Sequence, residues 1–312
     1  MPALICGSIA YDNIMVFEDS FKNHILPDQI HILNVAFLVP DMRREFGGCA
    51  INIAYNLKLL GEDPLPMATA GSDFEPYRER LAAQGIRQDH IRVIDKVFTA
   101  QAFITTDLDD NQITAFHPGA MNQSHLNDVG DAEDVTVGIV SPDGREGMLA
   151  HAAQFAAAGI PFIFDPGQGL PMFGGEELRQ FVDQAAWVTV NDYEWQLLKE
   201  RTGWDVDEVK QRVRALIVTR GAEGSVIHTP DADLEIPAVT PAAVSDPTGC
   251  GDAYRAGLLY GIMAGFDWLT VGRVASLMGS IKIECHGTQN HEFTRDEFTS
   301  RFQASFGEPL TE

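Results

Sequence analysis

The sequence predicts an α/β protein whose central sheet is mostly parallel and carries helices on both faces. From residue 134 onward, short apolar runs typical of strands alternate with stretches that have helical spacing, and such alternation is typical of parallel sheets. With 312 residues, 45% of them hydrophobic, the chain is long enough to bury this kind of core. No internal repeat or low-complexity tract interrupts it, so we expect no second independent domain.

The elements of this large unit follow in order from the N-terminus. A short buried strand is expected at 3–6, and a helix that begins after Gly47 and Gly48 is ended by Gly61. In the second half we expect strands at 135–140, 162–164, 187–190 and 215–219, and helices at 149–158, 175–184, 194–202 and 206–213.

Two stretches have no clear helical spacing and suit a small second sheet. Residues 14–41 contain short apolar pieces such as 30–39, while 98–106 alternates like a strand, turns at 109–111 and returns over 112–116. We therefore assign 14–41 and 98–120 to a small β-sheet lid. Residues 1–13, 42–97 and 121–312 form the large α/β unit. Small exposed sheets often pair with a copy of themselves, so a homodimer through the lid is left open.

The chain is strongly acidic, with a formal net charge of −23 from 22 Lys and Arg against 45 Asp and Glu. This balance argues against nucleic acid or an anionic membrane surface as a partner. The four cysteines lack the spacing of a zinc site or a disulfide framework, and the apolar runs are too short for a signal peptide or a membrane span. We expect a reduced, cytoplasmic protein.

The most informative stretch runs from Ser245 to Gly257 and reads SDPTGCGDAYRAG. Pro247 breaks whatever precedes it, Gly249 and Gly251 permit a tight turn, and helical spacing follows. This pattern predicts a loop that feeds a helix N-terminus. Because the first amides of a helix have no internal partner and carry partial positive charge, such a turn is suited to holding a phosphate group.

Asp252 lies inside this turn, where a carboxylate would repel a phosphate unless a hydroxyl also approaches. In that case Asp252 would orient the hydroxyl and accept its proton, while the amides of Gly249, Cys250 and Gly251 stabilise charge on the transferred phosphoryl group. The alternative is that Asp252 is only a first-turn acid favoured by the helix dipole.

The pattern from Asp246 to Tyr254, DPTGxGDAY, resembles the C-terminal signature of the ribokinase-like (PfkB) family of sugar and nucleoside kinases. The resemblance covers nearly the whole chain. It implies a ribokinase-like fold with a β lid, ATP as phosphoryl donor, and Mg²⁺. In some relatives a monovalent cation such as K⁺ binds nearby, which would place it here beside Asp246 and Thr248.

The same resemblance assigns residues that hold the substrate. Asp12 follows the first strand and the opening turn that contains Ser8, and by itself it reads as a turn or capping residue; in the family an Asp at this place accepts hydrogen bonds from sugar hydroxyls. Gly47, Gly48 and Asn52 match the N-terminal signature, where the glycines and the Asn hold the sugar. Without that context they would be a glycine-started helix with an incidental Asn.

Two further elements resemble the nucleotide site. Asn191 and Glu194 form a capping box by spacing, and Asn-x-x-Glu at this location in the family holds the water shell of Mg²⁺ and the ATP phosphates. The run from Thr219 to Gly224 resembles Thr-Lys/Arg-Gly-x-x-Gly, in which Thr219, Gly221 and Gly224 would line the nucleotide and Arg220 would approach its phosphates. A solvated surface cation is the alternative for Arg220.

A narrower resemblance is to the bacterial adenosine kinases of this family, where two aromatics stack on adenine and a Gln contacts it. Phe103, Phe116 and Gln168 would reproduce these contacts. Without the resemblance, cross-strand packing is the default explanation of the two aromatics, and Gln168 is an exposed residue of a turn. The resemblance implies an adenosine kinase that phosphorylates the ribose 5′-hydroxyl, giving AMP and ADP in purine salvage. The alternatives are a kinase for inosine, guanosine, ribose or fructose, or a non-catalytic nucleoside-binding relative.

Overall fold

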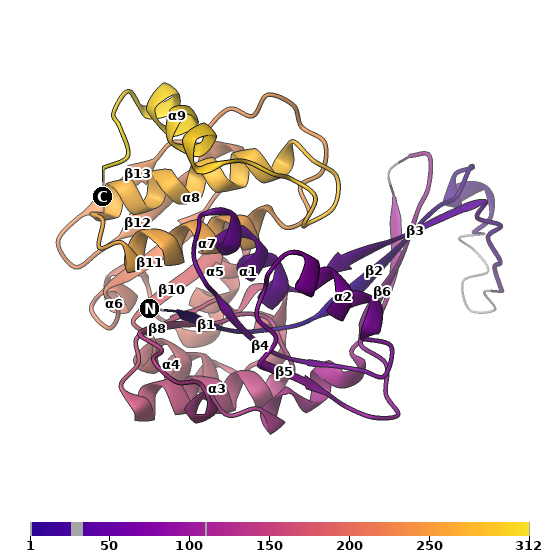
Figure 1. Ribbon diagram of the computed structural model, residues 1–312, viewed down its shortest axis with the longest axis horizontal. Coiled ribbons are helices and arrows are strands. Elements are labelled where there is room, and N and C mark those ends of the chain that lie inside the picture. The colour runs from indigo at the N-terminus through magenta and orange to yellow at the C-terminus, as the bar shows by residue number, and fades with distance from the viewer. Residues whose placement is uncertain (1, 26–33, 110, 312) are drawn as a thin grey trace.

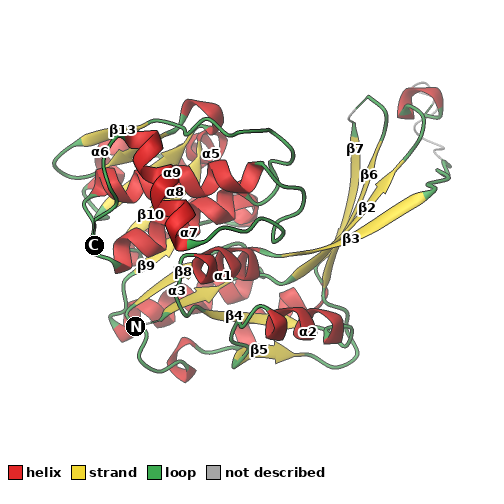
Figure 2. Ribbon diagram, turned by 45° about the horizontal axis from the view of Figure 1, so that its top comes forward, coloured by secondary structure: helices red, strands yellow, loops and turns green. Residues whose placement is uncertain are grey.

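The computed structural model describes residues 2–25, 34–109 and 111–311. Figure 1 shows a large body of helices and strands from which a narrow twisted sheet projects to one side, and Figure 2 shows the same projection from a second direction. We call this projecting four-stranded sheet the lid.

The body is built on a nine-stranded sheet in the order β13-β12-β11-β10-β9-β8-β1-β4-β5. All neighbouring pairs from β11 to β5 are parallel, and only β12 and β13 run antiparallel to their neighbours. The prediction of a mostly parallel sheet is therefore confirmed. Its strands are β1 (Ala3–Cys6), β4 (Leu65–Ala70), β5 (His90–Val93), β8 (Val137–Val140), β9 (Phe162–Phe164), β10 (Trp187–Asn191), β11 (Ala215–Thr219), β12 (Ser225–His228) and β13 (Asp233–Ile236).

Helices cover both faces of this sheet, because side chains alternate along each strand. Ile5 of β1 belongs to the core on one face and Leu4 to the core on the other. The first core is closed by α1 (Cys49–Leu59), α2 (Glu75–Ala83), α7 (Cys250–Met263), α8 (Trp268–Ile283) and α9 (Arg295–Phe306). The second is closed by α3 (Arg145–Ala158), α4 (Gly175–Gln184), α5 (Asp192–Thr202) and α6 (Val206–Lys210).

Short 3-10 helices connect these elements. They are η1 (Phe21–Asn23), η3 (Gly119–Leu126), η4 (Val129–Asp131), η5 (Gly167–Met172) and η6 (Gly221–Glu223). The predicted helix at 206–213 is shorter than expected, because α6 ends at Lys210 and a turn follows before β11.

The lid has the strand order β3-β2-β6-β7. Its strands are β2 (Ala10–Val16), β3 (Asp41–Gly47), β6 (Ala100–Thr106) and β7 (Gln112–His117). The strands thus run past the boundaries we set at 14 and 41, because β2 continues directly from the turn after β1 and pairs with β3 along its full length. Of the expected strand at 30–39, residues 30–33 lie outside the described residues, and 34–39 form no strand. Pairing of two lids into a homodimer stays a prediction.

The lid is anchored to the body at its base. The ring of Tyr11 packs against Phe46 and Tyr77, with centroids 5.8 and 5.5 Å apart, and its hydroxyl donates to the carbonyl of Asp73 at 3.1 Å. The carboxylate of Asp73 in turn accepts from the backbone amide of Thr99 at 2.7 Å. These contacts fix the position of β2, and therefore of Asp12, relative to α2.

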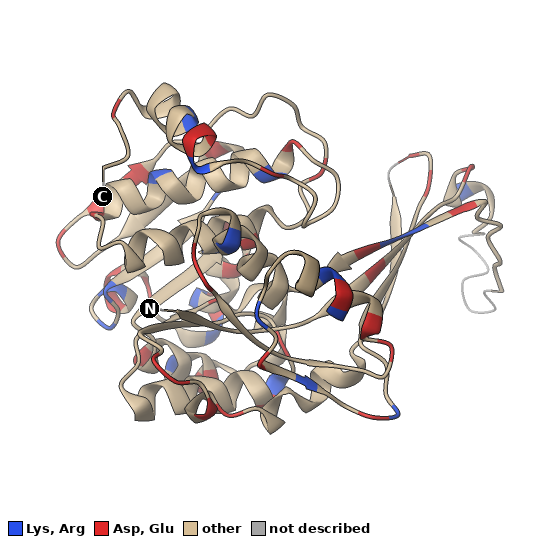
Figure 3. Ribbon diagram, viewed as in Figure 1, with Lys and Arg blue, Asp and Glu red and all other residues tan. Residues whose placement is uncertain are grey.

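Charged side chains are spread over both units. Figure 3 shows Lys and Arg interspersed with Asp and Glu along the elements rather than gathered on one of them. Within the residues that the structure describes, no helix combines the length and the apolar content needed to cross a bilayer. The cytoplasmic location stays a prediction.

The helix that follows the glycine turn is held in place by close packing. Gly257 of α7 lies so near α8 that a Cβ built on it would be 2.5 Å from the Cα of Ala275. Because the obstacle is backbone, it cannot rotate away, and the two helices would have to separate. The packing of α7 on α8 therefore sets where the N-terminus of α7 points.

We expect Gly257→Ala to lower the free energy of unfolding by about 1–3 kcal/mol, the range for overpacking a close-packed site. Gly279→Ala is the matched control on α8, because its Cβ would meet nothing nearer than the carbonyl oxygen of Cys250 at 3.7 Å. Urea denaturation measures both. Equal stabilities of the two variants would contradict the tight contact.

Candidate active site

The glycine turn leads into the N-terminus of α7, as predicted. Gly249 is the N-cap with φ +80°, and a Cβ there would lie 2.9 Å from the side chain of Thr288, so both the backbone and the space require glycine. The backbone N–H groups of Gly249, Gly251 and Asp252 have no partner among the described residues. These three amides are therefore available to an anion.

Cys250 differs from its expected role in this turn. Its backbone N–H donates to the carbonyl of Pro247 at 3.2 Å, because residues 247–250 close a tight turn. The Cys250 amide is therefore engaged within the turn, and its role at the phosphoryl group stays a prediction, whereas the amide of Asp252 has no partner among the described residues.

Asp252 lies partly buried in the first turn of α7 and accepts a hydrogen bond from Nδ2 of Asn52 at 2.8 Å. Burial raises the pKa of Asp252 to about 6, the bond from Asn52 opposes the rise, and the Asp165 carboxylate adds to it. At neutral pH the group is therefore mostly ionised and still close enough in pKa to act as a proton acceptor.

A chain of hydrogen bonds connects this carboxylate to Gly47, the last residue of β3, which precedes α1. The side-chain oxygen of Asn52 accepts from Nε2 of Gln289 at 2.9 Å, and the same Nε2 donates to the Tyr77 hydroxyl at 2.8 Å. That hydroxyl donates to the carbonyl of Gly47 at 2.8 Å. Asn52, expected to hold the sugar, is thus first a positioning residue for Asp252. Gln289 was missed, because no pattern in the sequence marks it.

Ser8 was expected at the substrate and instead caps α1. Its hydroxyl accepts from the backbone amide of Cys49 at 3.1 Å, and its carbonyl accepts from Ala50 at 3.1 Å. Ser8 is also buried, and its assignment as a substrate contact stays a prediction. The close approach of Ser8 to the start of α1 depends on Gly48. Its φ is +95°, and a Cβ built on it would lie 2.5 Å from the carbonyl oxygen of Ser8.

Asp12 is on β2, on the side of the lid that faces the glycine pair. Its carboxylate has no hydrogen-bond partner in the described part of the chain, and a Cβ on Gly47 would lie 2.6 Å from Oδ2. Burial raises the pKa of Asp12 to about 6, and the carboxylates of Glu45 and Asp246 add to the rise. An unpaired, partly buried carboxylate beside bare backbone is suited to accepting hydrogen bonds from hydroxyl groups.

The two aromatics of the lid do not face one another. Strand register pairs Ala102 with both Asp12 and Phe116, so Phe116 shares the face of Asp12, two strands and roughly 10 Å away. Phe103 pairs with Ala115 and points to the opposite face. Within one chain the two rings can form neither a cross-strand pair nor a clamp, and that expectation is wrong. Both rings are exposed, at 41% for Phe103 and 49% for Phe116.

A buried ion pair that the sequence did not reveal lies under the α7 turn. Arg255 donates to both carboxylate oxygens of Asp165, at 3.1 and 3.0 Å, and both side chains are almost fully buried. Asp165 directly follows β9. Gln168, three residues further on in η5, is exposed and makes no hydrogen bond to a described residue.

The capping box at the start of α5 is confirmed. Asn191 accepts from the backbone amide of Glu194 at 2.7 Å, and Oε2 of Glu194 accepts from that of Asn191 at 2.8 Å. The other carboxylate oxygen, Oε1, has no partner in the described residues. Burial raises the pKa of Glu194, and Asp165 adds to the rise. One free carboxylate oxygen suits a water of a hydrated Mg²⁺ better than direct ligation.

The neighbouring loop begins at Thr219, which pairs with Asn191 in the sheet. Gly221 has φ +56° with nothing within 4 Å of its Cβ position, and Gly224 has φ +85°. Arg220, however, forms an ion pair with Glu235 of β13. Its guanidinium is already engaged, so the expected approach to phosphates would need that pair to open.

The expected monovalent-cation site does not fit the structure. Both carboxylate oxygens of Asp246 accept backbone amides, from Thr248 at 2.9 Å and from Gly287 at 2.9 Å. The carbonyl of Asp246 accepts from Nζ of Lys282 at 2.7 Å. The side chain and carbonyl of Asp246 thus both have partners within the protein. Among the described residues there is also no group of three or more His, Cys, Asp or Glu placed to bind a metal.

Comparison with known proteins decides the family. The pfkB family of carbohydrate kinases matches residues 12–295. This chain belongs to the pfkB family. The Methanocaldococcus jannaschii nucleoside kinase is 32% identical over 272 residues, covering 86% of this chain and 89% of that protein.

Solved structures agree with this membership. The Burkholderia thailandensis nucleoside kinase in complex with inosine superposes with a TM-score of 0.90 at 55% identity, covering 98% of this chain and 99% of that one. Its ADP-inosine complex gives a TM-score of 0.87 at 57% identity, covering 98% and 97%. The ribokinase-like fold that we expected for this pfkB kinase is therefore confirmed.

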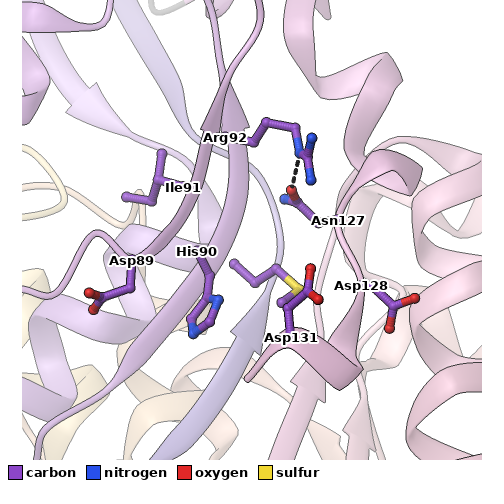
Figure 4. Close-up of a pocket in the computed structure, with 8 residues that line it drawn as sticks. Asp89, His90, Ile91, Arg92, Asn127, Asp128 and Asp131 are labelled. Carbon is purple, nitrogen blue, oxygen red and sulfur yellow. Dashed lines mark hydrogen bonds between the residues drawn. The ribbon is translucent and has the colours of Figure 1, made fainter. Parts of the chain in front are cut away.

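One other hollow of this pfkB kinase lies apart from these residues. Figure 4 shows a cavity of about 380 Å³ beside β5, crossed by the hydrogen bond from Arg92 to Asn127. None of the residues predicted for the site lines it. The candidate active site at the N-termini of α1 and α7 is thus separate from this cavity.

We expect Arg255→Met to lower the free energy of unfolding by about 3–5 kcal/mol, because it leaves Asp165 buried without its partner. Arg87→Met is the control, since Arg87 pairs with Asp89 at 2.8 Å on the exposed surface, where such pairs contribute about 0–1 kcal/mol. Thermal and urea denaturation compare the two. Similar losses in both variants would contradict the importance of burial.

Proposed function

We propose that this chain is an ATP-dependent nucleoside kinase that phosphorylates the ribose 5′-hydroxyl of purine nucleosides, giving the nucleoside monophosphate and ADP. The observation that carries the proposal is the Asp252 carboxylate, which shares its helix turn with three backbone amides that have no partner among the described residues. The carboxylate can accept a proton, and the three amides can donate hydrogen bonds to a negatively charged phosphoryl group.

In the proposed reaction the 5′-oxygen attacks the γ-phosphorus of ATP. A bond forms between this oxygen and phosphorus, the bond to the leaving oxygen of ADP breaks, and the hydroxyl proton passes to Asp252. The amides of Gly249, Gly251 and Asp252 stabilise the charge on the transferred group, because they are fixed before the reaction begins. Asn52 keeps the carboxylate aimed at the hydroxyl through its 2.8 Å hydrogen bond.

The ribose is proposed to lie between the lid and α1. Asp12 accepts hydrogen bonds from two ribose hydroxyls, since its carboxylate has no partner in the described residues and two free oxygens. Gly47 and Gly48 let the sugar lie against bare backbone, which a side chain at either position would block.

ATP is proposed to lie over the ends of β10 and β11. Thr219, Gly221 and Gly224 line the nucleotide, and Asn191 with Glu194 contacts the water shell of Mg²⁺. The bound Mg²⁺ would neutralise charge on the phosphates, which the acidic chain cannot do by itself. Arg220 joins the phosphates only after leaving Glu235.

The base is proposed to stack on Phe116 and to meet Gln168. The amide of Gln168 has both a donor and an acceptor, so it can pair with the amino edge of adenine or the oxo edge of hypoxanthine. Because Phe103 points away from Asp12, a clamp specific for adenine is not formed within one chain. We therefore propose both adenosine and inosine as substrates; the inosine complex of the 55% identical Burkholderia thailandensis enzyme favours the second.

A substrate panel tests the proposal. ADP formation from ATP is measured with adenosine, inosine, guanosine, ribose and fructose, each at the same concentration. Turnover with a nucleoside that far exceeds turnover with either sugar supports the proposed function. Turnover with a sugar alone would make the chain a sugar kinase, and none with any substrate would make it a binding protein.

We expect Asp252→Asn to reduce turnover by about 10²- to 10⁴-fold, the range for loss of one acid-base group, with little effect on nucleoside binding. Asp12→Asn is the comparison, because it should raise KM for the nucleoside more than it lowers kcat. Steady-state kinetics and calorimetric binding separate the two effects.

The pH profile is a control for the same assignment. An Asp252 carboxylate with a pKa of about 6 is active only when deprotonated, so the wild-type rate should fall as the pH drops through that value. The Asp252→Asn variant should lose the contribution of this group to the acidic limb. A variant that keeps most of its turnover would remove Asp252 from the mechanism.

We expect Phe116→Ala to raise KM for the nucleoside roughly 5- to 150-fold, since stacking of a base on an aromatic ring contributes about 1–3 kcal/mol. Phe103→Ala, on the opposite face of the lid, should leave this KM close to the wild-type value, and neither should change KM for ATP. Equal effects of the two variants on the nucleoside would contradict the assignment of faces.

A further inference from the structure

We infer that the ammonium group of Lys282 is a built-in cation that replaces the monovalent metal ion expected beside Asp246 and Thr248, so that phosphoryl transfer by this chain does not depend on K⁺. The inference rests on the proposed function for its activity readout. Its structural part stands on the contacts of Lys282 alone.

Lys282 is in the last turn of α8 and is fully buried. Its Nζ donates to two backbone carbonyls, that of Asp246 at 2.7 Å and that of Cys285 at 3.1 Å. A buried lysine is rare unless its charge is compensated. Here the compensation comes from carbonyl oxygens, which are also the oxygens that hold a dehydrated K⁺ in proteins.

The lysine acts on the segment that leads directly into the anion-binding turn. Asp246 is followed by Pro247 and Thr248, and its carboxylate accepts the amide of Thr248 at 2.9 Å and that of Gly287 at 2.9 Å. The amides of Ser245 and Asp246 both donate to the carbonyl of Ile283. The ammonium therefore holds the 246–248 segment against the end of α8, and this fixes where the free amides of Gly249 and Gly251 point.

The charges around Asp246 support the same role for Lys282. The Asp246 carboxylate lies near a site that must receive ATP, in a chain with a net charge of −23. A tethered ammonium supplies a positive charge there whenever Lys282 is protonated, at the C-terminal end of α8 where a cation is also favoured by the helix dipole. Burial lowers the pKa of Lys282, and the carboxylate of Asp246 opposes this shift. The nearby His291 adds no second charge at neutral pH, because burial and the charge of Lys282 lower its pKa to about 4.

A metal ion and this ammonium compete for the same oxygen. A K⁺ ion on the carbonyl of Asp246 would have to displace Nζ of Lys282 and leave a buried ammonium without one of its two acceptors. Because leaving a buried charge unpaired is strongly unfavourable, the lysine excludes the ion. We accordingly assign Lys282 as a positioning residue for the anion-binding turn.

The experiment compares the full-length wild type with Lys282→Met and Lys282→Ala. Met removes the charge and keeps most of the side-chain volume, whereas Ala also leaves room for an ion. Lys199→Met, at an exposed position on α5, is the matched control. Thermal midpoint and ADP formation with inosine and adenosine are measured in buffers whose only monovalent cation is K⁺, NH₄⁺ or the bulky tetramethylammonium.

The wild type and Lys199→Met should behave alike in all three buffers in both readouts. Lys282→Met should lose about tenfold or more in turnover in every buffer, because a small displacement of the amides is costly to catalysis. Lys282→Ala should show the same loss in tetramethylammonium. K⁺ or NH₄⁺ should restore part of its activity and raise its thermal midpoint.

A wild-type turnover or thermal midpoint that rises severalfold or by several degrees in K⁺ over tetramethylammonium would overturn the inference. So would a Lys282→Ala variant that is fully active and indifferent to K⁺. If that variant does not fold, the wild-type comparison decides by itself. If no nucleoside is phosphorylated, the proposed function fails, while the thermal midpoints still test the lysine.

Discussion

The geometry of the site depends on one partly buried hydrogen bond, from Asn52 in α1 to Asp252 in α7. These two helices begin at separate glycine turns, 200 residues apart in the chain, and their N-termini meet where this bond forms. Partial positive charge from both helices then surrounds a carboxylate whose own pKa is raised by burial. The bond keeps the Asp252 carboxylate in position to accept a proton and holds it away from the free amides that would bind an anion.

Much of this arrangement could be predicted, because each part has a local cause. Parallel strands end at one edge of the sheet, so polar residues after β1, β9, β10 and β11 had to gather there. The glycine turn before α7 and the capping box of Asn191 and Glu194 each depend on residues that lie close together in the sequence. The amphipathic and apolar runs placed most strands and helices within a few residues of their observed bounds.

What could not be predicted depends on partners far apart in the chain. Gln289 reaches Asn52 across 237 positions, and Arg255 reaches Asp165 across 90, without any pattern that marks either pair. The opposite orientations of Phe103 and Phe116 follow from strand register, which a one-residue difference in the hairpin would reverse. The family resemblance suggested a metal ion at Asp246, and only the three-dimensional structure reveals that Nζ of Lys282 already donates to the carbonyl of that residue.

The location of Asp12 on the projecting sheet, while Asp252 belongs to the body, has a thermodynamic consequence. A nucleoside bound as proposed touches both units at once, so it acts as a removable crosslink between them. Its free energy of binding then adds to the cohesion of the whole molecule by mass action. Proteolysis or hydrogen exchange at the base of the lid would therefore slow in proportion to how fully the cleft is occupied.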